Sequence, residues 1–129
     1  MSLEARPVEN EIAFPNGSAV MRVEYELGQL SVFVRGSPNE SSIVVDFSEV
    51  IGFRVLDERD LMEFWPACSA PNGGLFEIYQ GGWLAQELAR PGSLIGPMNM
   101  KALEYLVTGV DDCVSVLTQS PPLVRKFEG

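Results

Sequence analysis

Alternation of apolar and polar residues in the first third of the chain constrains the fold more than any other feature. Between residues 19 and 27 every second residue is apolar, and Arg22, Glu24 and Glu26 occupy positions between them. Because successive side chains of a β-strand point to opposite faces, this spacing predicts a strand with one face in a core and the other in water. Residues 30–35 and 42–47 repeat the pattern, which favours antiparallel strands.

The apolar positions of these three segments are expected to face one core, because neighbouring strands in register bury the same side of a sheet. Gly28-Gln29 predicts a tight turn between the first two segments. The expected core residues are Met21, Val23, Tyr25, Leu27, Leu30, Val32, Val34, Ile43, Val45 and Phe47.

Further β-like segments follow along the chain, separated by residues that favour turns. Gly52 is expected to mark a bulge, and residues 109–112 suit a hairpin loop. The expected strands are Val50–Leu56, Leu75–Gln80, Ala102–Thr108, Cys113–Thr118 and Leu123–Phe127.

Two short helices are expected between these strands. Asp57 can cap the first, which has apolar residues at helical spacing and is stopped by Pro66 after about two turns. The second covers Trp83–Arg90, where Gly81-Gly82 supplies positive φ before the helix and Pro91-Gly92 ends it.

Because strands mostly follow strands, the fold class is mainly β, with antiparallel sheets in a sandwich or partial barrel and two short helices; an α+β arrangement is the alternative. Met1-Ser2-Leu3 and Glu128-Gly129 look like residues of an expression vector. A single globular domain is therefore expected over residues 4–127.

The charge balance narrows the choice of partners. Acidic residues number 18 and basic residues 9, which gives a net charge of -9. A field of this sign repels phosphate, so nucleic acid and anionic membranes are not expected as partners, whereas a basic protein is favoured. No apolar run approaches the ~20 residues of a membrane span, and no secretory signal is seen, so a cytoplasmic location is expected.

The sequence contains no histidine and only two cysteines, Cys68 and Cys113. Histidine-based nucleophilic catalysis and most catalytic zinc sites are thereby excluded. The glycine pairs match no phosphate-binding motif. We therefore expect no catalytic residues, no metal and no cofactor, and the two cysteines suit a reducing compartment.

Carboxylates are the remaining chemical groups of interest. Asp57, Glu58, Asp60 and Glu63 lie close together, and Asp111-Asp112 form a second group. Acids at a helix start and in a hairpin loop have an ordinary structural explanation, the helix dipole and turn chemistry. Two converging carboxyl groups would instead permit glycoside hydrolysis, and an exposed acidic face would dock a basic partner.

Three aromatic residues near the expected helices, Trp65, Tyr79 and Trp83, have two interpretations. Exposed together they would form an interface hot spot, because Trp and Tyr dominate interface energetics. Buried, they would fill contacts between helix and sheet, which is expected for at least two of the three. The candidate partner-binding residues are Asp57, Glu58, Asp60, Glu63, Trp65, Tyr79 and Trp83.

Three stretches of the chain resemble small uncharacterised bacterial proteins of the toxin-immunity type: Gly52–Glu58, Gly81–Leu84 with Glu87, and Asp111–Leu117. This resemblance implies a non-enzymatic protein that neutralises a cognate toxin, and the net negative charge favours a basic toxin. It carries over no functional residue.

Three hypotheses follow. The first is a protein-binding module, most concretely an immunity-type inhibitor. The second is a small carboxylate-based enzyme, either a hydrolase or an isomerase. The third is a structural or oligomer-forming domain, and a homo-oligomer remains open under all three.

Overall fold

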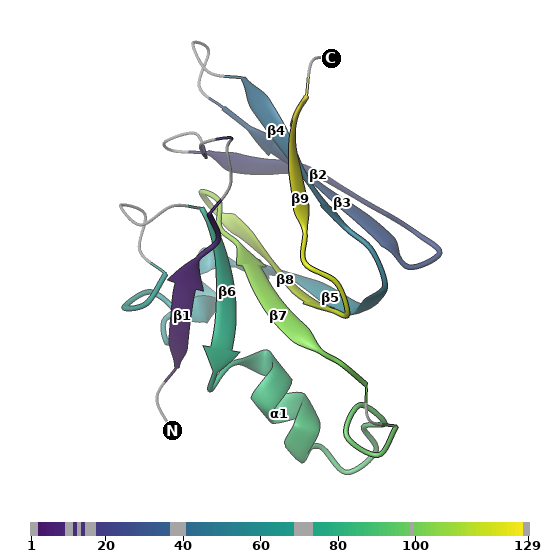
Figure 1. Ribbon diagram of the computed structural model, residues 1–129. Helices are drawn as coiled ribbons and strands as arrows, with labels where there is room; N and C mark the ends of the chain where they lie inside the picture. Colours follow the sequence, from purple (N-terminus) through teal and green to yellow (C-terminus); the bar gives the residue numbers. More distant parts are fainter. Residues whose placement is uncertain are drawn as a thin grey trace.

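Two antiparallel sheets packed face to face make up most of the protein (Figure 1). The computed structural model describes residues 3–9, 12, 14, 18–36, 41–68, 74–98 and 100–127. Among these residues neither sheet closes into a barrel. The mainly β prediction is thus confirmed, in its sandwich form.

The larger sheet has five strands in the order β1-β6-β7-β8-β5. They are β1 (Glu4–Pro7), β5 (Val50–Asp57), β6 (Leu75–Gln80), β7 (Leu103–Val107) and β8 (Asp112–Thr118). The smaller sheet has four strands in the order β2-β3-β4-β9. They are β2 (Ala19–Glu26), β3 (Gln29–Arg35), β4 (Ser42–Phe47) and β9 (Leu123–Phe127).

The β2–β3 hairpin turns at Leu27-Gly28, one residue earlier than predicted. Leu27 has φ 48° and Gly28 has φ 81°, and two positive φ values in a two-residue loop are typical of a type I′ turn. Leu27 is 92% exposed in this turn, so it does not belong to the core.

The core between the sheets contains every expected residue of β3 and β4. Leu30, Val32, Val34, Ile43, Val45 and Phe47 are buried and pack against Leu75, Tyr105, Val107, Val114 and Val116 of the larger sheet. Val23 is half-buried against this core, whereas Met21 and Tyr25 are exposed, which corrects the prediction for β2. The reason is that β2 lies at the sheet edge and its register shifts between Val20 and Arg22.

A second apolar cluster lies on the opposite face of the larger sheet. The segment after β5 covers this face of the sheet with Leu61, Phe64 and Cys68. The covered side chains are Phe76, Ile78, Leu106 and Cys113. The sheet is therefore buried on both faces in its centre, which explains why every residue of β8 after Asp112 is buried.

The first expected α-helix is a single 3-10 turn, η1 (Glu58–Leu61), followed by turns through Ala67. The Phe64 amide donates to the Leu61 carbonyl at 2.9 Å and the Ala67 amide to the Phe64 carbonyl at 3.1 Å, bonds between residues three apart as in 3-10 turns. The carbonyl of Glu58 also accepts a hydrogen bond from Trp65 Nε1 at 3.0 Å. The second expected helix is present as α1 (Trp83–Ala89). The described residues thus hold one α-helix where two helices were predicted.

Strand β1 was not predicted, because Glu4–Pro7 has neither alternation nor β-branched residues. It pairs only with β6 at the edge of the larger sheet. Pro7 is tolerated there, since a proline within a sheet is confined to edge strands and strand ends.

The core assignment predicts unequal costs for two valine truncations. Val45 is fully buried and Val23 is half-buried, so we expect Val45→Ala to lower the free energy of unfolding by about 2–3 kcal/mol and Val23→Ala by about 1 kcal/mol. Urea unfolding of both variants measures the difference. Equal costs would contradict the placement of β2 at the edge of the core.

Candidate partner-binding surface

Two acidic segments that are far apart in the sequence meet at one end of β5 and β8. Asp57 pairs with Asp112 across the two strands. The Glu58 amide donates a hydrogen bond to the Asp111 carbonyl at 2.8 Å. We call Asp57, Glu58, Asp111 and Asp112 the acidic corner. Like charges directly opposite each other destabilise a sheet, so the pairing of Asp57 with Asp112 opposes the stability of this ladder.

Asp57 has a local partner within the corner. Its carboxylate accepts hydrogen bonds from the Arg59 amide at 2.8 Å and from Arg59 Nε and Nη2 at 3.0 Å each. The hydrogen bonds from the Arg59 side chain and backbone lower the pKa of Asp57 to about 2. The predicted N-cap role of Asp57 is confirmed, because this carboxylate satisfies an amide at the start of η1.

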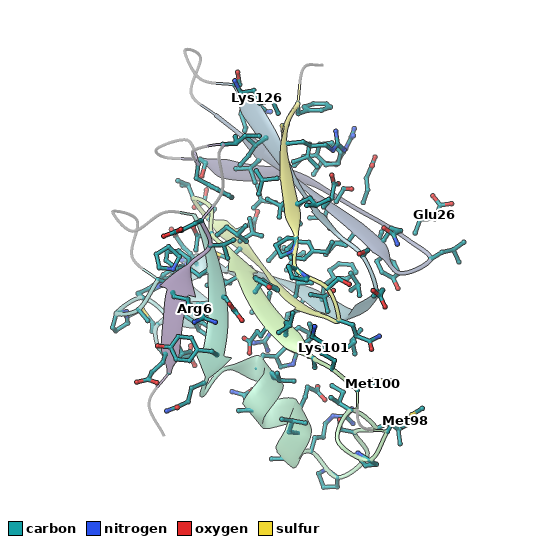
Figure 2. The ribbon with its side chains drawn as sticks, viewed as in Figure 1. Arg6, Glu26, Met98, Met100, Lys101 and Lys126 are labelled. Carbon is teal, nitrogen blue, oxygen red and sulfur yellow. The ribbon has the colours of Figure 1, made fainter. Side chains whose placement is uncertain are left out.

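The other three acids of the corner have no cationic partner among the described residues. None of the five ion pairs there involves Glu58, Asp111 or Asp112. The two lysines of the chain lie elsewhere: Lys126 is in β9, and Lys101 precedes β7 (Figure 2). The corner therefore presents unneutralised negative charge.

Exposed apolar side chains adjoin these charges. Val55 is 49% exposed and lies two residues before Asp57 on the same face of β5, and Val110 is 50% exposed just before Asp111. Protein interfaces combine such apolar contacts with a polar rim. Within the described part of the chain, no group of three or more Asp, Glu, His or Cys side chains is arranged to hold a metal ion.

Glu104 forms the second notable polar site, and sequence reasoning missed it. It is buried in β7, and its carboxylate accepts hydrogen bonds from the amides of Trp83 at 3.0 Å and Leu84 at 2.8 Å. These amides begin α1, where Gly82 provides no side-chain cap. Glu104 thus caps the helix from the sheet. The sequence did indicate a buried carboxylate here, because Glu104 is the single charged residue within the apolar run Leu103–Val107.

Arg54 lies beside this carboxylate on the same face of the larger sheet. Its guanidinium carbon is 4.4 Å from the centroid of the Trp83 ring, a cation–π contact. Burial raises the pKa of Glu104, and the hydrogen bonds from Leu84 and Trp83 and the charge of Arg54 oppose that shift. Arg54 Nε and Ser115 Oγ are buried here without a hydrogen-bond partner among the described residues.

The acidic residues predicted for partner binding do not form one group. Asp57 and Glu58 are in the corner, whereas Glu63 is exposed on the segment after η1, where its charge acts on Arg54. The side chain of Asp60 lies outside the described residues.

The three aromatic residues are also separated. Trp65 is half-buried against the second apolar cluster, and Trp83 lies under Arg54. Tyr79 is 54% exposed and contacts Arg6, with its ring centroid 5.2 Å from the guanidinium carbon. Because Tyr79 shares its side of β6 with Leu75 of the core, it faces away from Trp83. The aromatic residues are therefore not gathered into one patch.

Both cysteines are free and buried in the second apolar cluster. Burial raises the pKa of the Cys68 thiol to about 12 and also raises the pKa of Cys113. Thiols with raised pKa values are poor nucleophiles and poor metal ligands at neutral pH. They act here as small core side chains.

No protein-family model, curated protein or solved structure matches this chain. No helix in the described part of the chain has the length and apolar character of a membrane span.

The close packing of Glu104 and Ile78 around Gly82 predicts that any side chain at position 82 destabilises the protein. A Cβ at Gly82 would lie 2.7 Å from both Glu104 Oε2 and Ile78 Cγ2. We expect Gly82→Ala to lower the free energy of unfolding by about 1–3 kcal/mol through overpacking. The control is Gly92→Ala, whose Cβ would meet only the flexible Arg90 side chain at 3.4 Å. Equal effects in thermal unfolding would contradict this role of Gly82.

The raised pKa of Glu104 predicts a specific pH dependence. The folded state binds the Glu104 proton more tightly than the unfolded state, so the contribution of Glu104 to stability falls as pH rises from the ordinary Glu range through the raised pKa. We expect the stability of the wild type relative to Glu104→Gln to decline over that interval. Urea unfolding between pH 4 and pH 8 tests this, and a relative stability that rises with pH would contradict it.

Proposed function

We propose that this protein is a non-enzymatic protein-binding module whose acidic corner docks a basic protein. The role of an immunity-type inhibitor of a basic toxin fits this description. The observation that supports it best is the convergence of Glu58, Asp111 and Asp112 without a cationic partner among the described residues.

Electrostatics supports docking at this corner. The net charge of -9 attracts a basic partner from a distance, and the uncompensated acids of the corner would orient it on approach. Val55 and Val110 supply apolar surface beside the charges. An interface of this composition gains association rate and specificity from its charges and affinity from its apolar contacts.

The carboxylate-enzyme hypothesis is less well supported by the geometry. Such an enzyme needs a carboxyl group with a raised pKa that reaches a substrate. Among the described residues Glu104 has the raised carboxyl pKa, but each of its oxygens already accepts an amide of α1. Its position fits the capping of a helix better than proton transfer.

The proposal predicts that neutralising the corner slows binding without unfolding the protein. The wild type, immobilised at low ionic strength, is expected to capture a basic protein from a lysate of the source organism. We expect Glu58→Gln/Asp112→Asn to associate with that protein about tenfold more slowly, and the difference to shrink as salt is added.

The matched control is Glu4→Gln/Glu9→Gln, which removes two exposed negative charges in β1 and just after it, β1 being the sheet edge opposite β5. It is expected to associate at nearly the wild-type rate. Association rates that are reduced equally in both double variants would show a general charge effect and contradict docking at the corner. Thermal unfolding of both variants checks that each remains folded.

A further inference from the structure

Strand β5 is an edge strand that leads directly into the acidic corner. It spans Val50–Asp57 and is bonded to β8 on one side only. Among the described residues, the backbone of residues 51–56 makes no hydrogen bond beyond this ladder. An edge of this kind presents amide and carbonyl groups that can pair with another extended chain.

The other three sheet edges carry features that discourage pairing. β1 has four residues and ends at Pro7, and β9 carries Arg125 and Lys126. β2 has charged residues along its length and a register shift between Val20 and Arg22. The irregularity of β5 lies at its start, between Val50 and Gly52, so the stretch from Phe53 onwards remains regular.

Apolar side chains lie beside this edge. The Tyr25 ring of β2 is 5.2 Å from the Phe53 ring between centroids, and Tyr25 is 51% exposed. Val55 is exposed on the same side of β5 as Phe53. The β2–β3 turn is attached to the start of the edge, since the Val50 amide donates to the Gly28 carbonyl at 3.0 Å.

The acidic residues at both ends of β5 favour a basic segment over a second copy of this chain as the occupant of the edge. Glu49 precedes β5, and Asp57 and Glu58 follow its apolar residues. An antiparallel second copy would place Asp57 and Glu58 of one chain against Glu49 of the other, so self-pairing is opposed by repulsion. An extended segment with basic residues at its ends would meet opposite charge at both ends of the strand.

We propose that the β5 edge binds an extended segment of the basic partner by strand addition, with lysine or arginine of that segment at the acidic corner. This inference rests on the proposed function and specifies how the partner is held. The backbone ladder would supply affinity, and the side chains facing Val55 and Tyr25 would supply selectivity.

The probe is a short fluorescent peptide with alternating valine and threonine at its centre and paired lysines at each end. We expect it to bind the 129-residue protein and to slow amide hydrogen exchange in residues 51–56. An N-methylated version that blocks one bonding edge of the peptide should bind about tenfold more weakly, because it loses ladder hydrogen bonds.

Val55→Lys should weaken peptide binding by about tenfold through charge repulsion at the edge. Its control, Leu88→Lys, places the same charge at a comparably exposed position on α1 and should leave peptide binding unchanged. Thermal unfolding shows whether both variants are folded.

Several results would overturn the strand-addition proposal. The first is equal binding of the N-methylated peptide, with unchanged exchange in β5. The second is equal binding of a peptide whose lysines are replaced by serine, because the occupant would then not be basic. A third is a dimer in sedimentation velocity that Val55→Lys dissociates, which would assign the edge to a second copy.

The two proposals fail separately. If the captured protein still depends on Glu58 and Asp112 while β5 exchange stays unchanged, docking at the corner stands and strand addition is wrong. If Glu58→Gln/Asp112→Asn binds the captured protein as fast as the wild type, the proposed function itself is wrong.

Discussion

The antiparallel pairing of β5 with β8 connects the core of this protein to its candidate binding surface. One face of β8 contributes Val114 and Val116 to the core between the sheets, and the other face packs under the segment after β5. The last pair of the ladder, Asp57 with Asp112, is acidic on both strands. The interactions that fix the register of the core therefore also fix the position of the acidic corner.

At this end of the ladder, repulsion between acidic side chains opposes the pairing of β5 with β8. Opposed carboxylates repel, and Arg59 compensates only one of them by binding Asp57. Glu58, Asp111 and Asp112 form no ion pair within the described part of the chain. The buried Glu104 is different, because its charge is used entirely within the molecule to fasten α1 to the larger sheet.

Much of the fold could be predicted from local patterns. β4, β6 and β9 begin and end at the expected residues, because their apolar content and flanking turn residues define them locally. β1 was missed because its place depends on pairing with β6. The first helix was assigned wrongly because this segment closes with hydrogen bonds between residues three apart, such as Phe64 to Leu61, and apolar spacing does not distinguish these from the bonds of an α-helix.

The candidate site was less predictable for a related reason. Both acidic groups were visible in the sequence, but only the register of β5 on β8 shows that they meet. The cap formed by Glu104 depends on β7 lying next to the start of α1 in the fold, and no local sequence pattern shows that proximity. The exposed edge of β5 likewise follows from strand order.

The central claim is that a basic partner binds at the acidic corner. Zero-length cross-linking of the complex with a carbodiimide, which joins carboxylates to amines in direct contact, tests it most directly. The account predicts cross-links from Glu58, Asp111 and Asp112 to lysines of the partner. Cross-links confined to acids elsewhere, such as Glu4, Glu9 and Glu24, would contradict it.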